Sequence, residues 1–307
     1  MLTESPQDLM KAMPELEGIR MALNQDELKV VLRKVGEGVE SFFKNFPNTV
    51  SLEQVHQERL GKDGKVARSF DQGFQYLLLA HTEKWGLGIE EHRATPQGER
   101  AALGGYDQGL MLTAGFASVS LLFHPAYQNG AGFRYLGRQS LDRQETVKTN
   151  DSRMFLAKPD RTWTFDNLNG ESPPGKEMYV IAFAQNPQTA RTEERFSTDE
   201  GSALILIQGL AWIDPATFQI VRLRTDLLAP QSKVRLQRQT TEIHFKEVSF
   251  KEVANAFWLP EEVSVTVDWR GRIYRNWHRY SDFKLFNVET KEERKAPLLP
   301  APPDQRK

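Results

Sequence analysis

The sequence contains no cysteine in its 307 residues. Disulfide bonds, thiolate metal sites and a cysteine nucleophile are therefore excluded, which suits either the cytosol or the periplasm. Neither sign of charge predominates, since the formal net charge is −1. No overall field therefore attracts nucleic acid or anionic lipid. Long apolar runs are missing as well. The most apolar stretch, residues 203–213, is interrupted by Gln208 and Gly209 and falls short of the roughly 18 apolar residues that a membrane helix needs.

Motifs of common enzymes and nucleotide-binding proteins are absent too. There is no G-x-S-x-G elbow, no P-loop and no Rossmann glycine pattern. The six histidines show no H-E-x-x-H or other dense ligand spacing, so no metal site and no cofactor are predicted. Carboxylates such as Asp214 and Asp268 stand at expected strand ends, where aspartate favours turns. We therefore expect a protein that is not an enzyme.

One strong helix is predicted near the start of the chain. Its apolar residues recur at helical spacing and form one stripe, which predicts an amphipathic helix packed on a core: Leu28, Val31, Leu32, Val35, Val39, Phe42, Phe43 and Phe46. Asn24 and Glu27 resemble a capping box at its beginning, and Pro47 marks its end.

Most of the remaining pattern predicts strands. Residues 49–60 and 74–81 flank a tight turn at 61–64, which indicates a hairpin. Residues 85–109, rich in glycine and charge, are expected to be loop. From residue 178 onward strand follows strand, with the Asp214-Pro215 pair predicted as a hairpin corner, because proline fixes φ and cannot donate to a ladder.

This order predicts an α+β fold of mostly antiparallel strands, a curved open half-barrel wrapped around the helix. We expect a single half-barrel domain over residues 24–290, preceded by a lead-in at 1–23. Residues 151–177, which contain several proline and glycine turns, form an inserted excursion in this prediction. The charged, proline-rich tail at 291–307 is expected to be disordered.

Several short sequence segments, in this order along the chain, carry a family resemblance. They are NFPNTVSLEQVHQERL, FQYLLLAH, FRYLGRQ, YVIAFAQ, AWIDPATFQIVRLRTDL, FWLPEEVSVTV and RIYRNWHRYSDFKLF. Together they resemble bacterial envelope proteins of the LolA/LolB-like half-barrel fold, in particular an acidobacterial branch of this outer-membrane lipoprotein-sorting-like group. The resemblance implies a periplasmic, non-enzymatic protein that binds a lipid, an acyl chain or a lipidated protein. The 151–177 segment departs from the group's pattern.

The resemblance also guides the expected compartment. The first residues contain acidic side chains and no apolar core, so they do not read as a secretion signal. A periplasmic protein would then have had its signal peptide removed from this chain, whereas a native start at Met1 would favour the cytosol.

A ligand site is predicted from the inner face of the curved sheet. Such a sheet encloses a cavity unless a helix fills it. The residues expected to line that cavity are Trp212, Phe245, Val265, Val267 and Trp269. In the alternative interpretation these residues pack under the helix, and the protein is an interaction or structural module with a filled core that docks an envelope protein.

Arginines between residues 270 and 284 alternate with aromatic residues. This pattern can bind single-stranded nucleic acid, but nearby acids favour a solvated outer face of the sheet. We therefore expect neither a nucleic-acid partner nor a transmembrane segment.

Overall fold

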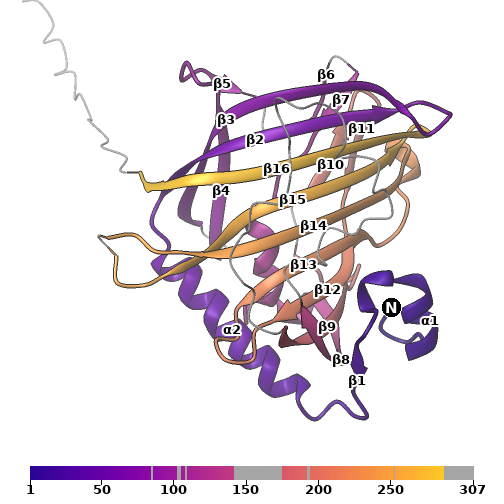
Figure 1. Ribbon diagram of the computed structural model, residues 1–307, viewed down its shortest axis with the longest axis vertical. Coiled ribbons are helices and arrows are strands. Elements are labelled where there is room, and N and C mark those ends of the chain that lie inside the picture. The colour runs from indigo at the N-terminus through magenta and orange to yellow at the C-terminus, as the bar shows by residue number, and fades with distance from the viewer. Residues whose placement is uncertain are drawn as a thin grey trace, which may run out of the picture.

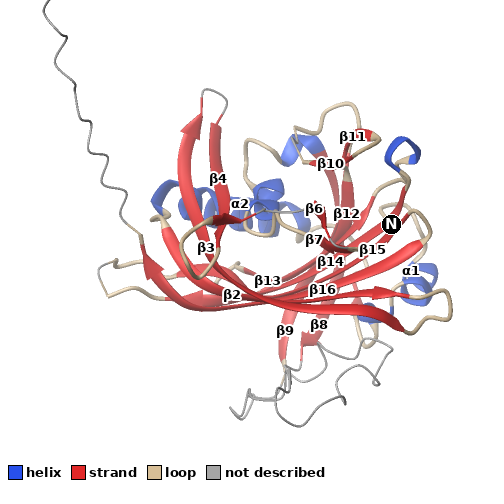
Figure 2. Cartoon of the chain, turned by 90° about the horizontal axis from the view of Figure 1, so that it is seen from above, coloured by secondary structure: helices blue, strands red, loops and turns tan. Residues whose placement is uncertain are grey.

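One large antiparallel sheet organises the chain (Figure 1). The computed structural model describes residues 1–83, 86–101, 105–107, 109–141, 175–191, 194–251 and 253–286. Within them twelve strands pair in the order β1-β8-β9-β12-β13-β14-β15-β16-β2-β3-β4-β5. The sheet curves strongly and stays open between β1 and β5 (Figure 2), which confirms the predicted half-barrel.

The strands of this sheet are β1 (Arg20–Met21), β2 (Thr49–Leu60), β3 (Val66–Glu83), β4 (Gly86–Ala94), β5 (Arg100–Ala101), β8 (Ala131–Leu141), β9 (Lys176–Gln185), β12 (Ile207–Ile213), β13 (Ile220–Leu227), β14 (Leu236–Val248), β15 (Phe257–Trp269) and β16 (Arg272–Leu285). Two small hairpins stand apart from it, β6 (Gly105–Asp107) with β7 (Leu110–Leu112), and β10 (Arg195–Thr198) with β11 (Gly201–Leu204). The helices are α1 (Pro6–Ala12) and α2 (Leu28–Asn45), with short 3₁₀ turns at Pro14–Leu16, Ser118–Phe123, Gln128–Gly130 and Ser232–Val234.

Helix α2 covers one end of the concave face. Five residues of its predicted stripe are buried, including Val35 and Phe43, and the other three are partly buried, while Val30 on the opposite side is exposed. The expected capping box is not formed: Glu27 precedes the helix without a side-chain cap, and Asn24 instead bonds Asp26. Packing of the apolar stripe, rather than a cap, therefore fixes the helix.

Strand β15 shows why α2 covers only part of the concave face. The Phe42 and Phe46 rings of α2 lie 5.9 and 5.7 Å from the Phe257 ring at the beginning of the strand. Trp269 ends the strand twelve residues later, about 40 Å away at ~3.3 Å per residue. The inward-facing side chains between them are buried in the main core, and the Trp269 end lies beyond the helix.

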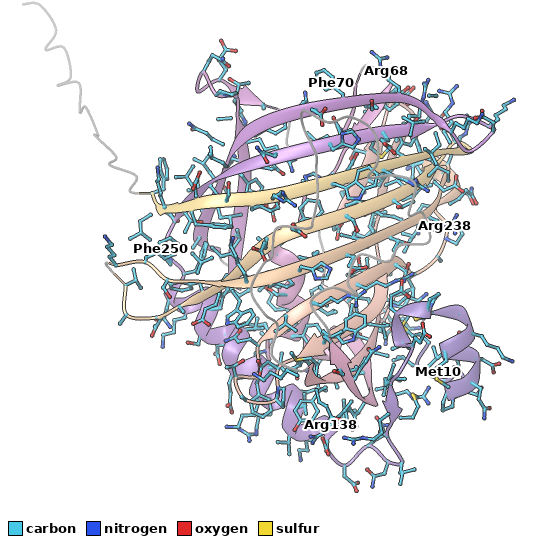
Figure 3. The ribbon with its side chains drawn as sticks, in the orientation of Figure 1. Met10, Arg68, Phe70, Arg138, Arg238 and Phe250 are labelled. Carbon is cyan, nitrogen blue, oxygen red and sulfur yellow. The ribbon has the colours of Figure 1, made fainter. Side chains whose placement is uncertain are left out.

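The N-terminal segment packs on the opposite, convex face. Leu9 of α1 and Leu16 are fully buried against Leu210 and Trp212 of β12, whereas Met10 on the outer side of α1 stays exposed (Figure 3). Polar contacts hold the same segment, because Gln139 donates to the backbone carbonyls of residues 15 and 17. The predicted lead-in, residues 1–23, therefore packs against the sheet.

Several predicted elements are confirmed. The hairpin of β2 and β3 pairs Thr49 with Leu78 and Arg59 with Arg68. At the Asp214-Pro215 corner, β12 turns into β13, and the Asp214 carboxylate accepts from the amide of Ala216 at 2.8 Å. Excursion residues 151–174 and tail residues 291–307 lie outside the described residues, and the excursion's last two residues begin β9.

The prediction of a loop at residues 85–109 is wrong. Strand β4 pairs with the end of β3, and β5 and β6 follow it. Hydropathy missed β4 because its inward-facing row contains Glu91 and Arg93 beside Ile89, and all three are buried. A strand that directs charged side chains inward has the composition of a loop.

Candidate functional site

A cavity of about 680 Å³ lies at the Trp269 end of the concave face, in the size range of roughly 300–1,000 Å³ typical of ligand pockets. We call it the chamber. The sheet forms one wall through Gln239 and Trp269, and the two small hairpins β6–β7 and β10–β11 form the others. Figure 2 shows both hairpins standing over the concave side of the sheet.

The chamber is rich in apolar and aromatic side chains. They are Tyr106, Met111, Leu112, Ala114, Phe196, Ile205 and Trp269. The Trp269 ring lies 5.0 Å from Tyr106 and 6.2 Å from Phe196, both edge-on, an arrangement that aromatic pairs favour. Among the polar lining residues is Glu194. The Glu194 side chain is exposed at the chamber; partial desolvation by the surrounding protein and then the negative charge of Glu91 raise its pKa to about 7.

A second space of about 320 Å³ adjoins the chamber, and we call it the vestibule. It shares Tyr106, Asp199, Trp269 and Arg270 with the chamber and is completed by Glu200, Arg235, Arg272 and Tyr274. The Arg270 guanidinium lies 4.4 Å from the centre of the Trp269 ring. The chamber and the vestibule therefore adjoin each other at Trp269.

The chamber wall at residues 111–117 is fixed by side chains that reach up from the concave sheet, an arrangement we call the loop clamp. It comprises the bonds Gln57 Nε2 to Met111 O (2.8 Å), Arg93 Nη2 to Thr113 O (3.0 Å), Asn276 Nδ2 to Thr113 Oγ1 (3.1 Å), and the amides of Gly115 and Ala117 to the Glu91 carboxylate (2.9 and 3.0 Å). The wall is held without any regular pairing to the sheet.

A buried ion pair lies behind the loop clamp. The side chains of Glu53 and Arg93 are fully buried, and Arg93 Nη2 lies 2.6 Å from Glu53 Oε1. The same oxygen accepts from His278 Nδ1 at 2.9 Å and Tyr280 OH at 2.8 Å. Burial by itself raises the pKa of Glu53, but hydrogen bonds from Arg93 and His278 outweigh it and lower the pKa to about 2.

Thr113, His278 and Glu53 form a hydroxyl–imidazole–carboxylate chain, the order found in hydrolytic triads. Ionised Glu53 can only accept, so His278 Nδ1 donates to it, and the neutral Nε2 accepts from the Thr113 hydroxyl at 3.2 Å. Burial lowers the pKa of His278 more than its bond to Glu53 raises it, and the positive charge of Arg93 lowers it further. Transfer of the Thr113 proton to His278 is thus disfavoured, and we interpret the chain as part of the clamp.

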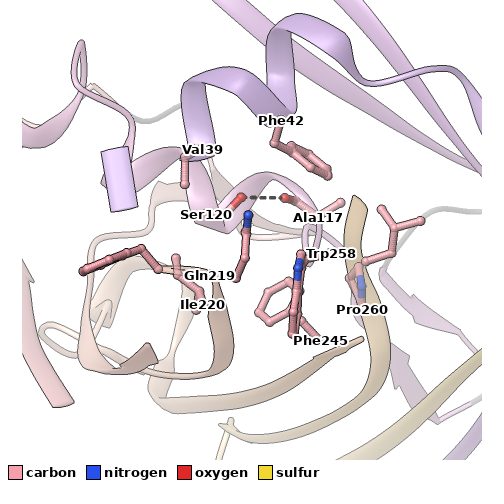
Figure 4. A pocket seen from close by; sticks show the side chains of 11 residues that line it. Val39, Phe42, Ala117, Ser120, Gln219, Ile220, Phe245, Trp258 and Pro260 are labelled. Carbon is pink, nitrogen blue, oxygen red and sulfur yellow. Dashed lines mark hydrogen bonds between the residues drawn. The ribbon is translucent and has the colours of Figure 1, made fainter. Parts of the chain in front are cut away.

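The five residues predicted to line one cavity lie in different parts of the structure. Trp269 lines the chamber. Val265 and Val267 occupy the same inward-facing row and are buried in the main core. Phe245 lines a different pocket, of about 30 Å³, between α2 and the strands β13 to β15 (Figure 4). Trp212 lies on the convex face, beneath the N-terminal segment.

Comparison with known proteins finds similarity among solved structures alone. No family model matches the sequence, and no curated protein matches it. Among solved structures, the chain is similar to a domain described as an outer membrane lipoprotein-sorting protein domain from Vibrio parahaemolyticus, with 9% identity, coverage of 85% of this chain and 94% of that chain, and a TM-score of 0.36. It is also similar to a DUF1329 family protein from Desulfovibrio piger, with 11% identity, coverage of 85% and 93%, and a TM-score of 0.38.

Two further features concern the described part of the chain. None of its helices is both long enough and apolar enough to cross a membrane. Its histidine and carboxylate side chains form no group of three or more that could hold a metal ion.

Proposed function

We propose that this protein binds the apolar chain of a lipid, an acyl group or a lipidated protein in the chamber, and shields that chain from water without catalysing a reaction. The chamber itself carries the proposal: a cavity of about 680 Å³ on the concave face of an open half-barrel, whose lining includes seven apolar or aromatic side chains. The bacterial envelope is the proposed compartment, following the sequence resemblance.

The energy of chain burial is sufficient for useful affinity. Each buried methylene contributes about 0.8 kcal/mol, so ten of them supply about 8 kcal/mol. This corresponds to a micromolar dissociation constant before the entropic cost of binding is subtracted. A longer chain or additional headgroup contacts would offset that cost.

The β10–β11 hairpin is the element most suited to admit the ligand, because the loop clamp holds the β6–β7 side of the chamber. Strands β6 and β7 pair over three residues and β10 and β11 over four, and neither pair joins the large sheet. An isolated two-stranded hairpin is only marginally stable. Opening of β10–β11 would expose the chamber while the clamped wall and the large sheet stay intact.

The alternative function, an interaction module with a filled core, is less well supported. Helix α2 fills one end of the concave face, but the chamber stays open at the other end. The ligand-binding function is therefore the better supported of the two.

Native mass spectrometry of protein purified without detergent, followed by organic extraction, tests the proposed function. We expect a bound lipid mass, or saturable uptake of one acylated probe per chain after delipidation. A protein that remains unliganded after incubation with phospholipids, fatty acids and acylated peptides would contradict it. Fractionation of cells expressing the native gene tests the compartment, with recovery in the periplasmic fraction expected.

The affinity for an uncharged chain is expected to depend on pH through Glu194. The pKa of Glu194 lies near 7, so below that pH its carboxyl is neutral and the chamber is less costly to desolvate. Cetyl alcohol should therefore bind several-fold more tightly at pH 6 than at pH 8, with an upper limit of about tenfold for each further pKa unit that binding induces. Equilibrium titration at both values measures the effect.

The matched variants for this titration are Glu194→Gln and Glu177→Gln. The first should bind equally at both pH values, because its side chain stays uncharged. The second removes an exposed carboxylate at the beginning of β9 and should keep the wild-type dependence. A pH dependence that persists in Glu194→Gln would assign the titration to another group.

A further inference from the structure

The vestibule differs from the chamber in its charge. Three guanidinium groups line it, from Arg235, Arg270 and Arg272, against two carboxylates, from Asp199 and Glu200. The chamber beside it has seven apolar or aromatic lining residues, and its charges balance, with Arg195 and Arg270 against Glu194 and Asp199. A ligand that spans both spaces must therefore be an amphiphile.

The two carboxylates do not balance the three arginines. Arg270 Nη2 lies 2.7 Å from both Asp199 Oδ1 and Glu200 Oε1, and Arg235 shares Glu200 at 3.3 Å. Arg272 pairs with no carboxylate in the described part of the chain, and Arg270 Nε is buried without a hydrogen-bond partner there. One positive charge and one buried donor are left over at the vestibule.

Trp269 holds these groups in place between the two spaces. Its indole Nε1 donates to the Val234 carbonyl at 2.8 Å, which fixes the ring, and Arg270 stacks on the ring at 4.4 Å. A guanidinium stacked on an aromatic ring keeps its edge free to donate. The donors of Arg270 therefore stand at the boundary between the chamber and the vestibule.

Resting on the proposed function, we propose that the ligand is an amphiphile with an anionic headgroup. Its chain occupies the chamber, and its carboxylate or phosphate lies in the vestibule against the exposed Arg272. Guanidinium groups bind both anions through charge-assisted hydrogen bonds. Fatty acids and lysophospholipids share this chemistry, and the test below distinguishes them.

Probes with one chain and different headgroups test this inference on the delipidated full-length protein. The probes are palmitic acid, cetyl phosphate, cetyl alcohol and cetyltrimethylammonium, each titrated below its critical micelle concentration. We expect the two anions to bind at least about tenfold more tightly than the alcohol, as one charge-assisted hydrogen bond allows, and the cation to bind most weakly. Added salt should reduce the preference because the vestibule is partly exposed to solvent.

Arg272→Gln is the decisive variant, because Arg272 is exposed and its replacement should not affect folding. It should lower the affinity for both anions towards that for the alcohol and leave the alcohol unchanged. Arg33→Gln, on the exposed side of α2, is the matched control and should bind like the wild type. If Arg272→Gln weakens binding of cetyl phosphate more than that of palmitic acid, the headgroup is a phosphate, as in a phospholipid. If it weakens binding of palmitic acid more, the ligand is a free fatty acid.

The outcomes separate the two proposals. Equal affinity for all four probes would overturn the anionic headgroup and leave chain binding intact. Binding of none of them would overturn the proposed function itself. An anion preference that survives Arg272→Gln undiminished would contradict the assignment to the vestibule.

Discussion

Replacing Glu53 with glutamine is expected to lower the free energy of unfolding by about 3–5 kcal/mol, the cost of removing one partner from a buried ion pair. Arg93 would remain charged and fully buried without its carboxylate. The same change replaces the charged oxygen that accepts from His278 and Tyr280 with a neutral amide oxygen, which accepts more weakly. Equilibrium unfolding in urea measures the loss.

Two controls distinguish the buried charge from a general packing defect. The double variant Glu53→Met with Arg93→Met removes both charges, and it should recover much of the loss, because well-packed apolar replacements of buried pairs are often neutral. Glu37→Gln removes one partner of the exposed Arg33–Glu37 pair on α2 and should change stability by less than about 0.5 kcal/mol. A Glu53→Gln protein as stable as the wild type would show that the buried Glu53–Arg93 pair does not stabilise the fold.

The same pair predicts how stability responds to acid. The pKa of Glu53 falls from 4.5 to about 2 on folding, so the stabilisation is fully present above about pH 4.5 and is lost as the pH falls towards 2. Because Glu53→Gln lacks this titration, its stability should vary less over that window.

Replacing Ala114 with tryptophan is expected to weaken binding of an acyl probe by at least tenfold. Ala114 lines the chamber on the clamped wall, and an indole there would occupy volume that the chain needs. A loss of two buried methylenes is worth about 1.6 kcal/mol, already more than tenfold in affinity. Displacement of a fluorescent fatty acid measures the change.

Val30→Trp is the matched control for that substitution. Val30 lies on the exposed side of α2, away from the residues that line the chamber, so the variant should bind like the wild type. Both proteins should unfold at similar denaturant concentrations. Undiminished binding by a folded Ala114→Trp protein would show that the chain lies elsewhere.

The fold could be predicted from the sequence because its signals are local. The stripe that includes Val35 and Phe43 identifies α2, and the alternation from Val263 to Trp269 identifies β15. Each pattern repeats with the period of one element, and the antiparallel order follows from the short turns between successive strands.

The site could be predicted only in part, since its determinants are not local. Every residue of β12 from Gly209 to Ile213 is buried, so hydropathy could not show that Trp212 faces the convex side. The clamp depends on pairs such as Glu53 with His278, which lie 225 positions apart. The chamber walls come from two short hairpins in glycine-rich and charged segments, whose composition predicts loops.

Quenching of tryptophan fluorescence by a brominated fatty acid tests the central claim most directly. Of the six tryptophans in the sequence, Trp269 lines the chamber, while Trp212 and Trp258 lie on the convex face and beside the α2 pocket. The chamber account predicts saturable quenching in the wild type and its loss in a Trp269→Phe protein that still binds the probe. Quenching that is unchanged by Trp269→Phe would place the chain outside the chamber and contradict the account.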